Sequence, residues 1–177
     1  MDAVDLLLAE RDIRAVVLRY CRGVDRMDRD LVQSCYHADA TDSHGSFEGG
    51  VDAFVEWLWR VLGRYSMTMH FVGNVLAEVD DSGDTATCES YGIAFHRTHN
   101  GGAAGNLTTG FRYIDRFARR PIGPGAEPEW RIARRVAVTE WVRADRVEDH
   151  WPIPPGLLTG RRDGTDAVQL AGRLGAG

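Results

Sequence analysis

A chain of 177 residues is long enough to bury one hydrophobic core without disulfides or metal ions. Its hydrophobic fraction of 44% and its charged fraction of 27% are ordinary for a globular domain. The formal net charge is −5 and no basic run exceeds a pair of residues, which argues against a nucleic acid as partner.

The cysteines and the apolar runs indicate the cell compartment. Cys21, Cys35 and Cys88 show no CxxC spacing, and the first two fall on predicted helical stripes, so we expect small core residues in a reducing environment. No apolar run is long enough to cross a bilayer, and the first residues do not resemble a signal peptide. We therefore expect a cytoplasmic protein with no membrane partner.

A first helix is predicted up to Asp25, with Asp2 as its N-cap. Its apolar residues recur at helical spacing and form one stripe, which suits a helix lying on a larger surface. The stripe consists of Ile13, Val16, Val17, Tyr20, Cys21 and Val24. It brings the Tyr20 phenol and the Asp25 carboxylate to the end of the helix, where a pocket beneath it would receive them.

Two further helices surround a polar stretch. Asp28 is predicted to cap a short second helix. Residues 37–50 are polar and end in two glycines, which favours a loop with one short strand over 43–48. A third helix follows, and its apolar stripe consists of Phe54, Val55, Leu58, Val61, Leu62 and Tyr65.

Beyond Ser66 the pattern changes from helical to extended. Helices that are segregated from an antiparallel meander favour the α+β class. We expect one domain over residues 1–148 and a Pro/Gly-rich tail over 149–177. The four strands are predicted over 67–79, 85–97, 107–119 and 129–142.

The tail contains apolar residues among its prolines and glycines, namely Trp151, Ile153, Leu157 and Leu158. We expect this segment to pack over the mouth of the pocket or against a neighbouring subunit. The alternative is a solvated terminus.

His70 and Asp25 are the candidate catalytic pair. Imidazole suits proton transfer near neutral pH, and a carboxylate can fix its tautomer and stabilise its imidazolium form. A lone histidine among apolar residues is nevertheless more often a core residue, and an acid at a helix end is often a cap. The spacing alone leaves both interpretations open.

Other polar residues also have two interpretations. Tyr20 either donates a hydrogen bond to a substrate or is a core aromatic residue. Glu89 and Tyr91 alternate with small residues, but the alternation does not say which face of the strand is inward. Arg134 and Arg135 must lie on opposite faces unless a bulge intervenes, so one of them points inward.

The sequence shows no pattern for a metal or a nucleotide. His37, His44, His96 and His99 are predicted to be loop and surface residues, without a metal-binding spacing, so no metal is expected. The glycines form neither a GxGxxG nor a GxxxxGK arrangement, so no nucleotide cofactor is expected.

An ordered set of motifs runs through about residues 5–145. It comprises Tyr20 and Asp25 at the helix end, then Met69-His70-Phe71-Val72-Gly73-Asn74, Glu89-Ser90-Tyr91, Ala94-Phe95-His96-Arg97, Arg112-Tyr113-Ile114-Asp115-Arg116-Phe117 and Trp130-Arg131-Ile132-Ala133-Arg134-Arg135. This set resembles the SnoaL-like branch of the nuclear transport factor 2-like superfamily.

The resemblance implies a cone-shaped, mostly antiparallel curved sheet, closed by three N-terminal helices around an apolar pocket. Relatives include scytalone dehydratase, bile-acid dehydratase and hexachlorocyclohexane dehydrochlorinase, in which a histidine held by an aspartate removes a proton. That pair maps onto His70 and Asp25, a tyrosine of the bile-acid enzyme onto Tyr20, and a pocket arginine onto Arg135. No lysine near Tyr20 matches the one in the dehydrochlorinase, which disfavours dehalogenation.

We therefore predict a cofactor-independent lyase of the dehydratase type that acts on a hydrophobic, steroid-like or polycyclic small molecule. An isomerase or polyketide cyclase with the same pair, or a binding protein without catalysis, are the alternatives. The predicted catalytic residues are His70, Asp25 and Tyr20, and the predicted substrate-binding residues are Arg135, Glu89 and Tyr91.

The expected assembly follows from the sheet. Strands covered by helices on one face leave the other face open, and Trp141 and its neighbours supply an apolar patch there. We expect a homodimer or a larger symmetric homo-oligomer through this outer face.

Overall fold

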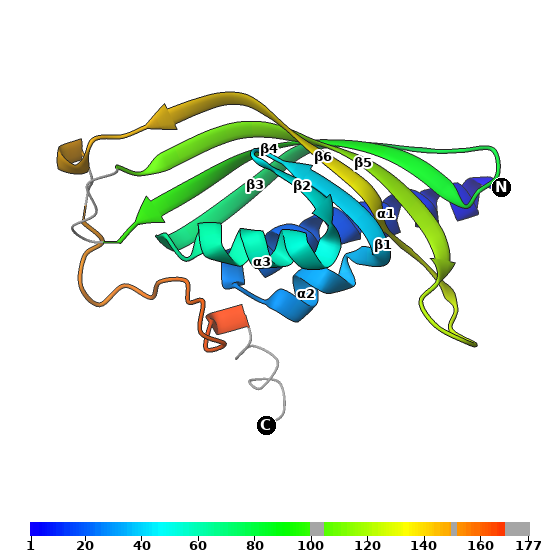
Figure 1. Cartoon of the computed structure of the whole chain (residues 1–177), viewed down its shortest axis with the longest axis horizontal. Helices are drawn as coiled ribbons and strands as arrows, with labels where there is room; N and C mark the ends of the chain where they lie inside the picture. Colours follow the sequence, from blue (N-terminus) through cyan, green and yellow to red (C-terminus); the bar gives the residue numbers. More distant parts are fainter. Residues whose placement is uncertain (100–104, 150–151, 169–177) are drawn as a thin grey trace.

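A curved sheet arches over the helices in the computed structural model, which describes residues 1–99, 105–149 and 152–168 (Figure 1). The elements are α1 (Ala3–Arg26), α2 (Arg29–Ser34), β1 (Tyr36–His44), β2 (Phe47–Gly50), α3 (Val51–Leu62), β3 (Tyr65–Val79), β4 (Thr85–Thr98), β5 (Leu107–Pro121), β6 (Pro128–Ala144) and the 3₁₀ turn η1 (Val147–Asp149). The sheet has six strands in the order β2-β1-β6-β5-β4-β3, and among these only β1 and β6 pair in parallel. The predicted α+β class and curved, mostly antiparallel sheet are confirmed.

Helix α1 begins at the predicted cap. Asp2 Oδ1 accepts hydrogen bonds from the backbone N–H groups of Val4 (2.9 Å) and Asp5 (2.8 Å), which would otherwise lack partners. The predicted stripe is buried, and the helix ends at Met27, which takes a left-handed backbone conformation (φ 54°). None of the described helices combines the length and the apolar character that crossing a membrane requires.

The stretch predicted to be a loop with one short strand is instead the hairpin of β1 and β2, which turns at Gly45 (φ 60°). The prediction was wrong because polar residues such as His37 and Asp42 occupy buried positions of β1, so the apolar alternation of a strand is missing. The distant strand β6 supplies the parallel ladder that holds β1 in the sheet.

The four long strands lie where they were predicted, within one or two residues at each end. A register shift between β5 and β6 near Phe117 lets Ile132 and Arg135 both point inward, although an uninterrupted strand would place them on opposite faces. The prediction that one of Arg134 and Arg135 points inward is therefore confirmed, and that residue is Arg135.

The tail meets the domain mainly through charged side chains. Ile153, Leu157 and Leu158 are 46%, 62% and 85% exposed, so the expectation that they cover the pocket mouth is wrong. Trp151 lies outside the described residues, and packing of the tail against a neighbouring subunit stays a prediction. Arg162 and Asp166 instead hold the tail against the ends of α3 and α1.

The convex face of the sheet carries a patch of exposed apolar residues that point away from the helices. Met69 faces Phe95 across the β3–β4 ladder, while Phe71, Tyr91 and Trp141 line one shallow hollow. Apolar patches of this kind mark interfaces between proteins.

We predict a homodimer that buries this convex patch. Phe71, at 65% exposure, lies within it, so Phe71→Glu is expected to convert the dimer into a monomer. Leu158→Glu is the control, because Leu158 is 85% exposed in the tail and lies outside the patch. Light scattering at micromolar concentration measures the mass, and a monomeric mass for the unaltered chain would contradict the prediction.

Candidate active site

Asp25 and His70 are in direct contact although they lie 45 residues apart in the chain. His70 Nδ1 is 2.6 Å from Asp25 Oδ1, and the backbone N–H of His70 donates to Asp25 Oδ2 at 2.9 Å. A carboxylate oxygen accepts hydrogen bonds, so Nδ1 of His70 is the donor in this contact. The contact expected from the sequence is present, whereas the catalytic roles of the two residues stay a prediction.

Each partner is fixed by its own element. Asp25 is the penultimate residue of α1, and the left-handed Met27 turns the chain away directly after it. His70 occupies an inward position of β3 between the outward residues Met69 and Phe71. Because both carboxylate oxygens bind the same residue, the carboxylate cannot rotate without losing a hydrogen bond.

His70 lines a cavity of about 200 Å³ beneath the sheet. A Cβ atom at Gly92 would come within 2.4 Å of the Phe111 ring, so this glycine makes room for one wall of the cavity. Most of the lining side chains are apolar or aromatic, as predicted. They include Tyr20, His44, Trp57, Leu58, Tyr65, His96, Phe111 and Tyr113.

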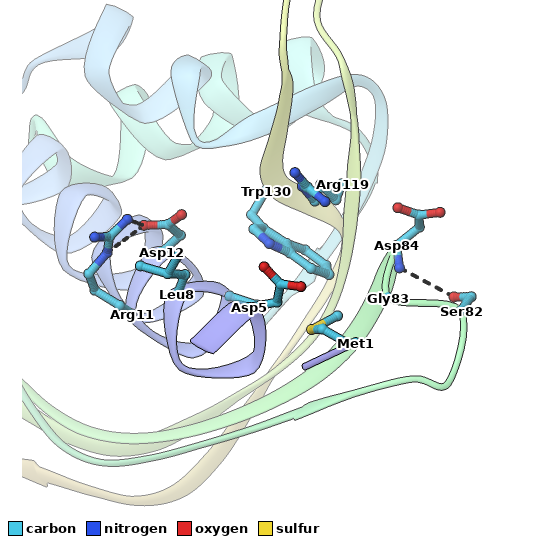
Figure 2. Close-up of a pocket in the computed structure, with 11 residues that line it drawn as sticks. Met1, Asp5, Leu8, Arg11, Asp12, Ser82, Gly83, Asp84, Arg119 and Trp130 are labelled. Carbon is cyan, nitrogen blue, oxygen red and sulfur yellow. Dashed lines mark hydrogen bonds and ion pairs between the residues drawn. The ribbon is translucent and has the colours of Figure 1, made fainter. Parts of the chain in front are cut away.

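A larger hollow, of about 340 Å³, lies near the start of α1 and the β3–β4 turn (Figure 2). Its side chains include Asp5, Asp84 and Arg119, together with an Arg11–Asp12 ion pair. None of its lining residues is a histidine, so it lacks the imidazole that suits proton transfer near neutral pH. We therefore place the candidate active site in the smaller cavity, on its chemistry and not its volume.

His96 was predicted to be a surface residue, but it lines the cavity from β4. Its ring lies 6.2 Å from that of His70 and 4.8 Å from that of Tyr65. Burial, followed by the neighbouring His70, lowers the pKa of His96 to about 4. His96 is therefore neutral near pH 7 and places no fixed positive charge beside His70.

His44 also lines the cavity, which corrects its assignment to the surface. Its Nδ1 lies 3.5 Å from Asp42 Oδ1, and the Tyr36 hydroxyl donates to Asp42 Oδ2 at 2.7 Å. The ring stacks on Phe54 with centroids 5.6 Å apart and approaches Tyr113 at 5.8 Å. A second histidine, also beside an aspartate, thus contributes to the cavity from β1.

Two further histidines among the described residues, His37 and His99, lie in the core and on the surface respectively. His37 was predicted to be exposed, but it is buried on β1 with Nε2 at 2.8 Å from the Ala118 carbonyl oxygen. Burial lowers its pKa. His99 is exposed, as predicted. Among the described residues, no three His, Cys, Asp or Glu side chains converge in a way that would hold a metal ion.

Tyr20 and Arg135 lie one behind the other at the wall of the cavity. Tyr20 is a wall of the cavity, and the Arg135 guanidinium lies behind it, 4.2 Å from the Tyr20 ring centroid and 4.0 Å from that of Tyr113. Arg135 donates two hydrogen bonds of 2.7 Å to Asp115, and both side chains are fully buried. Arg135 does not line the cavity but supports its aromatic wall, and the substrate contact predicted for it stays a prediction.

Glu89 and Tyr91 lie on the convex face of β4, opposite to the cavity. Their inward neighbours Cys88 and Ser90 are buried, while Glu89 pairs with Arg112 at 2.7 Å and Tyr91 is 44% exposed. Glu89 and Tyr91 therefore do not line the cavity that contains His70, and their substrate-binding role stays a prediction. The residues that the sequence analysis missed are His44 and His96, and only the inward parity of His96 with His70 on paired strands could have indicated one of them.

A curved open sheet with helices on its concave side and a mostly apolar cavity beneath it is the fold of the nuclear transport factor 2-like class. Within this class the chain belongs to the SnoaL-like family, because residues 5–136 match the SnoaL-like domain. The family expected from the sequence is therefore confirmed.

Three similar proteins illustrate this membership. An uncharacterized protein of Mycobacterium tuberculosis (strain H37Rv) is 31% identical over 129 residues, which cover 71% of this chain and 81% of the relative. A structure proposed to be a scytalone dehydratase from Novosphingobium aromaticivorans has a TM-score of 0.69 at 19% identity and covers 88% of this chain and 99% of its own. Hexachlorocyclohexane dehydrochlorinase from Novosphingobium barchaimii has a TM-score of 0.72 at 16% identity and covers 86% of this chain and 100% of its own. The two structures show the shared fold.

The support role of Arg135 predicts a loss of stability. Arg135→Met leaves the buried Asp115 carboxylate without its partner, which is expected to lower the free energy of unfolding by about 3–5 kcal/mol. Arg134→Met, at the exposed neighbouring position, should change it by less than about 0.5 kcal/mol. Urea unfolding measures both values, and a fully stable Arg135→Met protein that binds ligand poorly would instead indicate a substrate contact.

The lowered pKa of His96 predicts that the protein loses stability in acid. The unfolded chain protonates this residue below its ordinary pKa of 6.5, whereas the folded chain does so only near 4, so stability falls as the pH drops through this window. His96→Gln should remove about 2 kcal/mol of that fall between pH 7.5 and pH 4.5 in urea unfolding. His99→Gln is the exposed control, and equal acid sensitivity in the two variants would refute the prediction.

Proposed function

We propose that this protein is a cofactor-independent lyase that eliminates water from a hydrophobic, polycyclic or steroid-like small molecule. The observation that carries the proposal is the 2.6 Å contact between His70 Nδ1 and Asp25, made by a histidine that lines an apolar cavity. The dehydratase and dehydrochlorinase structures of the same fold support this class of reaction.

The proposed reaction uses His70 as the base. Nε2 takes a proton from a carbon next to a carbonyl group, and Asp25 stabilises the imidazolium that forms. The electron pair of the broken C–H bond becomes the new C=C bond as the C–O bond breaks. The departing hydroxyl takes the proton back from the imidazolium and leaves as water, so His70 returns to its starting state.

Tyr20 is the proposed hydrogen-bond donor in the wall of the cavity. Burial raises the pKa of its phenol, and the positive charge of Arg135 only partly opposes this effect. The phenol therefore keeps its proton and can donate a hydrogen bond to a carbonyl or a departing oxygen. His44 supplies another polar group in the cavity.

The substrate class follows from the cavity. A volume of about 200 Å³ with mostly apolar and aromatic walls suits part of a fused ring system, with a few polar groups to orient it. An isomerase acting on an enolisable ketone, or a polyketide cyclase, would use the same base, and a carrier would use the cavity alone. These alternatives are distinguished by the products of the following experiment.

The contact between Asp25 and His70 predicts a specific loss of activity when Asp25 is replaced. Asp25→Asn can hold the imidazole in the wrong tautomer, so turnover of a β-hydroxy polycyclic ketone should fall at least about a hundredfold while the fold is kept. Asp12→Asn is the control on the same helix, because the Asp12 side chain is 45% exposed. Formation of the conjugated enone is followed by ultraviolet absorbance.

The products separate the remaining outcomes. A product isomeric with the substrate, without loss of water, would favour an isomerase or a cyclase. Binding without turnover would favour a carrier, and unchanged turnover in Asp25→Asn would contradict the proposed role of the pair.

A further inference from the structure

The end of the described tail, residues 160–168, folds back against the last turn of α1. Asp166 is only 5% exposed and accepts a hydrogen bond from the backbone N–H of Arg161 at 2.8 Å. Its Oδ2 also lies 3.3 Å from Nε of Arg26. Because Arg26 directly follows Asp25 in α1, this ion pair holds the tail beside the candidate catalytic carboxylate.

Arg162 reaches the corner between α3 and β3. Its Nη1 donates to the carbonyl oxygens of Tyr65 (2.6 Å) and Leu62 (3.3 Å). Leu62 is the last residue of α3, where carbonyl oxygens lack partners within the helix and a positive charge is favourable. Leu62 and Tyr65 both line the cavity, so this contact fixes part of its wall.

The Arg162 guanidinium also acts on Asp25. Its Nε and Nη2 atoms are buried and make no hydrogen bond to any described residue, so this attraction acts through space. Burial lowers the pKa of Arg162, and the Asp25 carboxylate is the largest opposing influence, ahead of the like charge of Arg26. The contacts of Arg162 with Leu62 and Tyr65 and of Asp166 with Arg26, the residue next to Asp25, therefore bring this cation to the same corner of the cavity as the Asp25 carboxylate.

Two other titratable groups lie near the His70–Asp25 pair. Burial raises the pKa of Cys21 on α1 to about 12, and burial lowers that of His96 on β4 to about 4. Both groups are uncharged near pH 7. Arg162, Arg26 and Asp166 are charged groups in this region, and Arg26 is paired with Asp166.

We propose that Arg162 is a positioning residue for the His70–Asp25 pair, because it ties the tail to the α3–β3 corner and holds a cation near the Asp25 carboxylate. Its catalytic consequence rests on the proposed function, but the placement of the charge does not. A cation near Asp25 competes with the imidazolium for the same negative charge, so Arg162 disfavours the protonated form of His70. The base then stays ready to accept a proton at lower pH.

The test is an NMR titration of the His70 imidazole signals in the full-length protein without substrate. Arg162→Met should move the titration of His70 to higher pH by about half a unit to one unit, and Arg162→Lys, which keeps the charge, should restore most of the difference. Arg161→Met is the matched control, because the Arg161 side chain is exposed and pairs with Asp163 at 2.7 Å within the tail.

Identical His70 titrations in Arg162→Met and Arg161→Met would overturn the proposal. If the titration moves but no elimination is found with any substrate, the proposed function fails and the assignment of Arg162 stands.

Discussion

The two hydrogen bonds that Asp25 accepts from His70 tie the end of α1 to the sheet. One carboxylate oxygen binds the imidazole and the other binds the backbone N–H, so the end of the helix is fixed to one residue of β3. Tyr20 belongs to the buried stripe of the same helix, so the stripe and this contact together place it in the wall of the cavity. The group that would orient a catalytic base is therefore part of the scaffold as well.

Behind the cavity, a buried ion pair supports the aromatic wall. Removing the charges of Arg135 and Asp115 from water is costly, but two short hydrogen bonds and the faces of Tyr20 and Tyr113 compensate for it. Burial raises the pKa of the Tyr20 phenol, and the charge of Arg135 only partly opposes this effect, so the phenol stays protonated. The cavity thus contains a neutral phenol at Tyr20 and a neutral ring at His96, near an imidazole that is paired with a carboxylate.

The tail extends this arrangement beyond the residues that match the family, which end at residue 136. Helix ends offer carbonyl oxygens without intrahelical partners, and a long cationic side chain can satisfy them where an apolar one cannot. This explains why Arg162 docks at the end of α3 while Leu157 and Leu158 remain in solvent. A polar segment can therefore add charge to a site without adding to the core.

The sequence by itself determined the helices, the four long strands, the α+β class and the family, because these follow from local periodicity, caps and the order of motifs. It also indicated Asp25 and His70 as a pair. Only the tertiary structure decided that β1 is a strand, since its ladder comes from a distant partner and its buried residues are polar. Strand parity, bulges and sheet curvature, which no local pattern encodes, likewise decided which way Glu89 faces and that His44 and His96 line the cavity. They also decided that Arg135 pairs with Asp115.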